Sequence, residues 1–534
     1  MDERVAQVIA SLEANAKHDP ERQEQYTEVP DAQQIPESPE SDATIDFEKL
    51  VDFKSMSYQE RSYYENFASD AVFARARVAG LNPMTLRAVT IADMETSETG
   101  WMPTDVHLRE ASSAFVRDSL RKAQEQHRLY MLDYKWLENA PESACDARCV
   151  FVPKALFAVP VDDSARWETT LVPVAIWIYR KGMKKSDAKL YTPKDGYSWQ
   201  IAKLIVNVLD GNDHEYYRHL GLTHLLIEPF AIALKRHLHR DHPLVRLLES
   251  HIVGTMFINR EAVQVLLAGN GPVDMNLMSP ITQMAPVLNE KLSSIRFNDH
   301  FLEPMLEARG VANSELSFPY RDYSRLLWTA IRSWIQTYIF EFYEDDSSIV
   351  LDTELQQWAH EIVSSDVINI DAFGDDAFLS GRSKHVISTR SYLIEALTMI
   401  VFTASCQHAA LNFAQKYFLA YSPAWPLALK RTELPPVGID ATKTTRAEWK
   451  SWLPTLKEAL VQWSTNQLLG GVTHTRLGQY PPKVTAGKPR LQQGLADFQS
   501  SLAEIGAIIE KREESAIVQY LVLHPDQIPA SINI

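Results

Sequence analysis

The chain has 534 residues, of which 45% are hydrophobic and 23% charged, so it is long and apolar enough to bury a large core. Its formal charge of −16 argues against a nucleic-acid partner and against a polybasic membrane anchor. Its 3 cysteines are too sparse for a disulfide framework, which favours a reducing compartment. Because we find neither a secretory leader nor a run of about 18 apolar residues, we expect a cytoplasmic protein.

The N-terminal residues 1–47 are predicted to form an acidic arm or linker. Residues 1–48 contain 13 acidic and 3 basic side chains, and residues 18–46 are too polar and proline-rich to fold alone. Apolar residues at helical spacing predict a short amphipathic helix that can dock on the body or touch a membrane: Val5, Val8, Ile9 and Leu12. Residues 48–534 contain no fixed repeat and are expected to form one domain.

The remaining pattern predicts a mainly α fold with a small β subdomain near residues 149–182. Apolar, β-branched runs at 149–152 with 158–161, and at 171–179, indicate strands. Helical periodicity dominates elsewhere and predicts helices over residues 198–238, 244–268, 322–344, 353–363, 390–420, 447–469 and 489–515.

Two histidines in the first of these helices attract attention. His219 and His224 are separated by four residues, so an ideal α-helix would point them about 140° apart. A π-type turn between them would bring both imidazoles to one side, and Gly221 is a plausible place for that irregularity. The alternative is an ordinary pair of hydrogen-bonded core histidines.

A second polar pair lies downstream, and the C-terminus is apolar. His408 and Asn412 are four residues apart and share one helical face among small and apolar residues. Such a pair suits either a common metal ion or a cross-helix hydrogen bond. The chain ends at Ile534 without charged neighbours, which predicts a buried terminus whose carboxylate must be paired or coordinated.

Motifs in several separated parts of the chain point to one known family. Upstream stand Phe73-Ala74-Arg75, Ala79-Gly80-Leu81-Asn82-Pro83 and Leu129–Tyr134. The long helix continues from Trp199-Gln200 through His214-Glu215, His219-Leu220, Thr223-His224 and Glu228-Pro229-Phe230 to Ile258-Asn259. Downstream stand Thr403-Ala404-Ser405, His408-Ala409-Ala410, Asn412-Phe413, Gln415 and the terminal isoleucine. Over roughly residues 60–534 the sequence resembles a lipoxygenase.

The resemblance implies a large multi-helix catalytic domain around long central helices, and it implies a metal site. His219, His224 and His408 would be imidazole ligands, Asn412 a weaker oxygen ligand, and the Ile534 carboxylate the anionic ligand. The cofactor would be one non-haem iron, because the chemistry needs a redox couple that zinc lacks. Manganese members usually have one residue fewer between the first two histidines, so the spacing here favours iron.

By family mechanism, the substrates would be O2 and a polyunsaturated fatty acid of the linoleate or arachidonate type. Abstraction of a bis-allylic hydrogen atom, then capture of the radical by O2, would give a conjugated-diene hydroperoxide. Two alternatives stay open: an isomerase or lyase that uses the same iron on preformed hydroperoxides, and a catalytically silent lipid-binding protein. Peripheral membrane contact and the oligomeric state also stay open.

The resemblance further implies roles around the metal. His214, Glu215 and Gln415 match positions that link the metal ligands to the substrate channel. Ala262 matches the site where alanine accompanies S products, and Leu266 the site of a bulky side chain that shields the pentadiene. Side chains in residues 266–277 and in the helix of the 390s are expected to set pocket depth.

Two departures from the family pattern stand out. The sequence resembles the compact microbial type, because too little chain precedes Phe73 for the N-terminal β-sandwich lipid-binding domain of plant and animal members. Val263 stands where many relatives have an arginine. Arg260 is close in sequence but is expected to point elsewhere on the helix, which leaves the partner of the fatty-acid carboxylate open.

Overall fold

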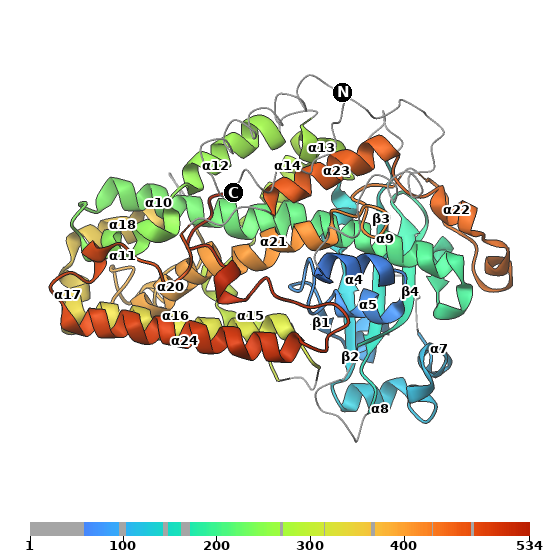
Figure 1. Cartoon of the computed structure of the whole chain (residues 1–534), viewed down its shortest axis with the longest axis horizontal. Coiled ribbons are helices and arrows are strands. Elements are labelled where there is room, and N and C mark those ends of the chain that lie inside the picture. The colour runs from blue at the N-terminus through green and yellow to red at the C-terminus, as the bar shows by residue number, and fades with distance from the viewer. Residues whose placement is uncertain are drawn as a thin grey trace.

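Two long helices run through the centre of the computed structural model (Figure 1). The first comprises α9 (Tyr197–Asp213), a π-helical segment (His214–Leu225) and α10 (Leu226–His237). The second comprises α20 (Arg390–Phe402), a π-helical segment (Thr403–Gln407) and α21 (His408–Phe418). Apolar side chains cover all sides of α20, which is the pattern of a fully buried helix. These two helices form the core around which the other elements pack.

The structure describes residues 58–95, 103–142, 148–161, 171–267, 271–313, 316–364, 369–429, 431–470 and 475–534. The predicted acidic arm over residues 1–47, with its amphipathic helix, lies outside the described residues. Within the described part, Arg390–Phe418 is long and apolar enough to cross a membrane, but 94% of its most apolar window is buried inside the protein. We therefore interpret Arg390–Phe418 as a core helix.

Further helices surround the two central ones. The long pair α16 (Pro319–Phe342) and α24 (Pro489–Glu513) packs together along one side (Figure 1). The site described below is bordered by α11 (Pro243–Ile252), α12 (Thr255–Glu261), a π-helical segment (Ala262–Leu266), α13 (Pro272–Asn276), α14 (Ile281–Ser293) and α23 (Leu456–Leu469). The remaining helices are α4 (Tyr58–Asn66), α5 (Asp70–Arg75), α6 (Ile91–Glu95), α7 (Asp105–Ala111), α8 (Leu120–Glu125), α15 (Leu302–Ala308), α17 (Asp346–Leu351), α18 (Thr353–Val363), α19 (Asp376–Leu379) and α22 (Arg446–Lys450).

One antiparallel sheet forms the β subdomain, with strand order β1-β2-β3-β4-β5. The central strand β3 (Phe151–Ala158) pairs with β4 (Val172–Arg180), so that Ala155 lies opposite Ile176. The sheet is wider than predicted, because the short strands β1 (Arg87–Ala88), β2 (Leu129–Asp133) and β5 (Lys189–Tyr191) extend it on both sides. The first strand was predicted as two runs, residues 149–152 and 158–161. In the structure, β3 is one continuous strand that includes Pro153 and ends at Ala158.

The mainly α prediction is confirmed, but two predicted helices are interrupted. The helix expected over residues 244–268 ends at Ile252 and restarts at Thr255, because Gly254 takes a positive φ of 82° that a continuing helix excludes. The helix expected over 447–469 is divided into α22 and α23, with Pro454 in the intervening segment. The first interruption has a direct role at the functional site.

Candidate metal centre

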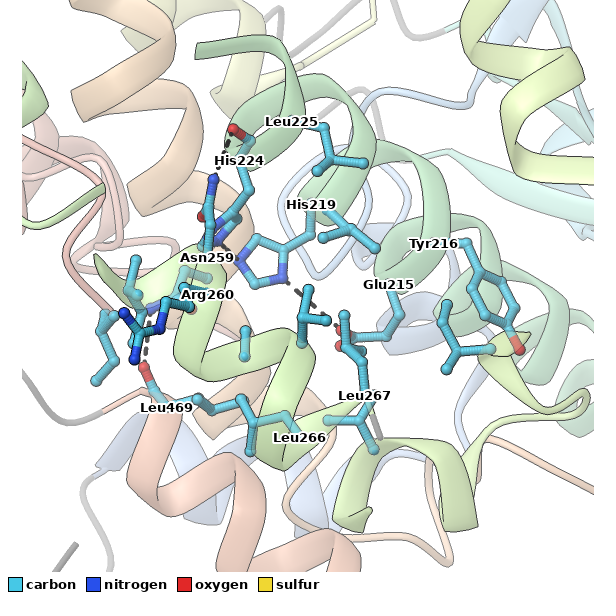
Figure 2. A pocket seen from close by; sticks show the side chains of 18 of the residues that line it. Glu215, Tyr216, His219, His224, Leu225, Asn259, Arg260, Leu266, Leu267 and Leu469 are labelled. Carbon is cyan, nitrogen blue, oxygen red and sulfur yellow. Dashed lines mark hydrogen bonds and ion pairs between the residues drawn. The ribbon is translucent and has the colours of Figure 1, made fainter. Parts of the chain in front are cut away.

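Three buried imidazoles meet where the central helices cross. The ring centroids of His219 and His224 are 4.9 Å apart, and that of His408 lies 5.4 Å from His219 and 5.1 Å from His224. One ligand nitrogen from each ring lies within 4.8 Å of the other two. Figure 2 shows His219 and His224 turned toward each other, and their Nε2 atoms are 3.3 Å apart. This arrangement can hold a metal ion.

The predicted π-type turn is what brings His219 and His224 together. Both lie in the π-helical segment His214–Leu225, whose wider turn places residues five apart on the same side. Gly221 lies in the middle of this segment, where a Cβ atom would come within 2.8 Å of the Leu292 side chain on α14. A larger residue at this position would require the flexible Leu292 side chain to shift, so glycine favours close packing against α14.

The third histidine and the asparagine come from α21. Asn412 is fully buried, and its Nδ2 donates to the carbonyl of Leu469 at 2.8 Å. Its Oδ1 accepts a hydrogen bond from Gln415 Nε2 at 3.1 Å, and the side chain faces the same cavity as His219 and His224. The predicted common face of His408 and Asn412 is confirmed, because both lie within one regular α-helix.

The C-terminal segment reaches the same place, and the break between α11 and α12 accommodates it. His251 Nδ1 donates to the carbonyl of Ala530 at 2.7 Å, and Thr255 Oγ1 donates to the carbonyl of Ile532 at 2.9 Å. A Cβ on Gly254 would stand 2.9 Å from Asn533 Cβ, so glycine is needed for this approach as well as for its φ. The predicted burial of Ile534 is confirmed, at 8% exposure.

The residues present fit a metal ion. His408 is 1% exposed, and neither of its ring nitrogens makes a hydrogen bond of ordinary geometry, although the Ile534 backbone lies close enough to affect its pKa; such a group is costly in a protein interior. Burial, together with the neighbouring imidazoles, lowers the pKa of His408 well below its usual range, and burial lowers the pKa of His224 to about 3. Burial also lowers the pKa of His219, so all three present the neutral imidazole, which is the form that binds metals. The donors are nitrogen and oxygen atoms without a thiolate, a set that suits iron.

The predicted supporting residues lie behind the imidazoles. Glu215 places one carboxylate oxygen 3.2 Å from His214 Nδ1 and the other 3.7 Å from His219 Nδ1. Burial opposes ionisation of Glu215, but His214 and His219 outweigh it and lower its pKa to about 2. Gln415 Nε2 lies 3.5 Å from His219 Nδ1. Of His214, Glu215 and Gln415, only Glu215 also lines the cavity beside the histidines.

Asn259 holds His224 in position, a role that the sequence analysis missed. Its Oδ1 lies 2.7 Å from His224 Nδ1, and its Nδ2 donates to the His224 carbonyl at 3.2 Å and to Glu228 Oε2 at 3.0 Å (Figure 2). Because Nδ1–H donates to Asn259, Nε2 is left as the metal-binding atom. The sequence contains Ile258-Asn259 within the family motif, but the motif alone does not indicate what Asn259 contacts. The contact depends on the packing of α12 beside the π segment.

Replacing Asn259 with leucine should weaken metal binding by about 10- to 100-fold, because His224 loses the acceptor that fixes its ring and tautomer. Competition between the protein and a chelator for iron measures this effect. Asn276→Leu is the matched control, since Asn276 is also 7% exposed but hydrogen-bonds only the Pro272 carbonyl within α13. Equal iron affinity in the two variants would contradict the role assigned to Asn259.

A mostly apolar cavity of about 290 Å³ opens beside the histidines. His219, His224, Asn412 and Ile534 form one part of its wall, and Ala262 and Leu266 also line it, as predicted. The other lining residues are mainly aliphatic: Leu220, Leu225, Ile258, Leu267, Val273, Leu277, Ile281 and Leu469. Residues within 266–277 line the cavity as expected, but no residue of α20, the helix that contains the 390s, lines it. Arg260 lines the cavity, which corrects the expectation that it points elsewhere, because its long side chain reaches the rim from the adjoining turn.

Comparison with known proteins identifies the family of this chain. The family model described as Lipoxygenase matches residues 5–520. The linoleate 9/13-lipoxygenase of Pseudomonas aeruginosa is 33% identical over 501 residues, covering 88% of this chain and 67% of that protein. The chain belongs to the lipoxygenase family. Human hydroperoxide isomerase ALOXE3 is 27% identical, with 91% of this chain and 66% of that protein covered. The family's non-haem iron matches the donors of this site.

The fold agrees with solved lipoxygenase structures. A calcium-dependent 11R-lipoxygenase superimposes with a TM-score of 0.78 at 27% identity, covering 88% of this chain and 66% of that one. Coral 8R-lipoxygenase gives a TM-score of 0.77 at 27% identity, covering 89% and 67%. The chain thus spans about two thirds of the length of these relatives, and about half of a chloroplastic lipoxygenase from Arabidopsis thaliana. The predicted lipoxygenase catalytic fold is confirmed.

Acidic conditions should loosen the anchor of the C-terminal segment. Burial lowers the pKa of His251 to about 4, below its usual 6.5, while the unfolded chain binds this proton near pH 6.5. The free energy of unfolding therefore falls as the pH drops from about 6.5 to 4, by at most about 3 kcal/mol from this residue. The unfolding temperature of wild type should decline more between pH 7 and pH 5 than that of His251→Gln. Equal declines would exclude His251 as the cause.

Proposed function

We propose that this lipoxygenase inserts O2 into polyunsaturated fatty acids of the linoleate or arachidonate type and forms S-configured conjugated-diene hydroperoxides. The observation that carries the proposal is the aliphatic cavity, one part of whose wall contains His219, His224, Asn412 and Ile534. An acyl chain in this cavity would place its pentadiene beside the metal site, and aliphatic walls would keep water from the radical. The relative from Pseudomonas aeruginosa is named for linoleate.

We assign the metal ligands on the same basis. His219, His224 and His408 are proposed as imidazole ligands, Asn412 as a weaker oxygen ligand, and the carboxylate of Ile534 as the anionic ligand. Bound iron would supply the one-electron Fe(II)/Fe(III) couple that hydrogen abstraction needs. The proposed roles of His214, Glu215 and Gln415 are to orient these ligands, which their contacts with His219 and Asn412 support.

The chain's own residues position the substrate. Leu266 packs against Leu469 and Ile534, so it would hold the pentadiene close to the ligand cluster. Ala262 lies one turn earlier on the same cavity wall, where its methyl group would restrict O2 to one end of the pentadiene. The S configuration is a proposal that rests on this alanine.

Ala262→Gly should shift the product toward the R hydroperoxide, with the R share rising several-fold, because the lost methyl group frees space at the other end of the pentadiene. Chiral chromatography of the reduced products measures the shift. Glycine in a helix costs about 1 kcal/mol, so the variant should remain folded. Ala262→Val, which narrows the same space, should keep S as the main product. An unchanged R share in the glycine variant would remove the basis for S.

A second activity has support in the comparisons. ALOXE3 proteins of human, rat and mouse are named hydroperoxide isomerases. The same iron ligands would serve that reaction, which consumes a preformed hydroperoxide and needs no net O2. A silent lipid-binding protein is the weaker alternative, because it has no need for three buried imidazoles whose nitrogens lie within 4.8 Å of one another.

Parallel assays with linoleate and with its hydroperoxide separate these functions. A dioxygenase should consume O2 and form conjugated diene in equal molar amounts from linoleate. Rapid loss of hydroperoxide with little O2 uptake would instead establish the isomerase or lyase, and inactivity in both assays with iron bound would favour the silent protein.

We also propose a cellular location and a domain organisation for this chain. A cytoplasmic, reducing location is supported by the small number of cysteines, 3 in 534 residues. We propose that residues 48–534 form one catalytic domain preceded by the acidic arm 1–47.

A further inference from the structure

Gln407 connects the π segments of the two central helices. It is the last residue of the segment Thr403–Gln407 and is 4% exposed. Its Nε2 donates to the carbonyl of Leu222 at 3.2 Å. Leu222 lies in the segment His214–Leu225, between two of the proposed imidazole ligands, and Gln407 directly precedes the third, His408. One hydrogen bond therefore joins the irregular parts of both ligand-bearing helices.

The two hydroxyl side chains of the same segment bond within their own helix. Ser405 Oγ donates to the carbonyl of Val401 at 2.6 Å, and Thr403 Oγ1 donates to a sulfur atom four residues earlier at 3.7 Å. Such local bonds do not constrain the position of a helix relative to its neighbour. The amide of Gln407 does, because it reaches the backbone of the other central helix.

Backbone hydrogen bonding changes register at both places that this link connects. The N–H of His408 donates to the carbonyls of Thr403 and Ser405, five and three residues earlier. The N–H of Leu226 donates to the carbonyl of Thr223, three residues earlier. A regular α-helix would use the carbonyl four residues earlier. A change between α and π spacing rotates the residues that follow it, so the direction of the ligands depends on where the change is held.

Two other side-chain hydrogen bonds join the central helices. His214 Nε2 donates to the carbonyl of Leu411 at 3.1 Å, and Gln415 Nε2 lies 3.5 Å from His219 Nδ1. Both reach the first π segment at or before His219, whereas Gln407 reaches it beyond that residue. Loss of the Gln407 bond would therefore leave the helices packed together but free the stretch that leads to the next proposed ligand.

We propose that Gln407 is a positioning residue, whose hydrogen bond to the Leu222 carbonyl sets the placement of His224 relative to His408 and thereby the geometry and affinity of the metal site. This inference rests on the proposed function, because it takes these histidines as iron ligands. A supporting residue of this kind acts through the ligands and needs no contact with the substrate.

Gln407→Met keeps the length of the side chain and removes its donor. It should weaken iron binding, measured by competition with a chelator, by at least about tenfold. At saturating iron, the EPR spectrum of the oxidised enzyme should change its line shape, because this spectrum responds to the arrangement of ligands around iron(III). With linoleate, kcat should fall while KM stays close to that of wild type, because Gln407 does not line the cavity.

Gln356→Met is the matched control. Gln356 is 7% exposed, and its Nε2 donates to the carbonyls of Ile349 and Ile387, which lie outside both central helices. Each methionine variant leaves a buried carbonyl without its donor, so both should unfold at a lower temperature than wild type. Only the variant at 407 should change iron affinity and the EPR spectrum. Gln407→Asn, whose amide is one methylene too short for Leu222, should resemble Gln407→Met and serves as the test if the latter does not fold.

Wild-type iron affinity and a wild-type EPR spectrum in the Gln407 variants would overturn the inference and leave Gln407 as an ordinary partner of a buried carbonyl. If the variants show the expected changes while wild type binds iron but forms no diene, the inference holds and the proposed dioxygenase function fails. A wild-type protein that binds no iron would overturn both.

Discussion

His408→Ala should abolish iron binding and, with it, diene formation. His408 lies at the start of α21 and is 1% exposed, and its ring centroid is within 5.4 Å of those of the two other imidazoles. Removing it takes away a proposed ligand that the surrounding small and apolar residues cannot replace. Because loss of a supporting residue alone weakens metal sites by about 10- to 100-fold, loss of a ligand should exceed about 100-fold.

Thermal unfolding separates this effect from misfolding. Iron binds the folded state and so stabilises it, and a chelator should lower the unfolding temperature of wild type. His408→Ala should resemble chelator-treated wild type and should not respond to the chelator. His360→Ala, at an exposed position on α18, should bind iron like wild type. Normal iron content in His408→Ala would contradict the assignment of this ligand.

Deletion of Ile534 should have a comparable effect, because the ligand proposed here is the terminal carboxylate and not the side chain. Deletion moves the carboxylate back by one residue, about 3.8 Å along the chain. Hydrogen bonds from His251 and Thr255 fix the preceding residues Ala530 and Ile532, so the shortened end cannot follow. Iron per chain should fall at least about tenfold.

Two further variants distinguish the carboxylate from the side chain. Ile534→Val keeps the carboxylate in place and should retain iron. An added alanine after Ile534 keeps the side chain but displaces the carboxylate, and it should lose iron as the deletion does. If the deletion or the extension retained both iron and activity, the Ile534 carboxylate would not be a ligand.

The sequence predicted the local geometry of the two proposed ligand pairs well because their spacing was informative. The interval between His219 and His224 does not suit an ideal α-helix, so a shared site required a π-type turn, and the π segment His214–Leu225 confirms it. His408 and Asn412 required only a regular helix, which α21 provides. In both cases the geometry depended on residues within one continuous helix.

Predictions that depended on tertiary packing were less successful. The break at Gly254 was not predicted, because its cause is the approach of Asn533, which lies 279 residues away in the chain. The hydrogen bond between Asn259 and His224 depends on the packing of α12 against the π segment, which the sequence did not indicate. The predicted direction of Arg260 was wrong. In an ideal helix Arg260 and Ala262 point to opposite sides, but both residues line the cavity here.

The most direct test measures iron, O2 uptake and conjugated-diene absorbance on one preparation of purified protein with linoleate. The account predicts about one iron per chain, equal molar amounts of O2 consumed and diene formed, and loss of all three signals in His408→Ala. Diene formation that persists in His408→Ala, or a wild-type protein that forms diene without iron, would contradict the central claim that this histidine cluster holds the catalytic metal.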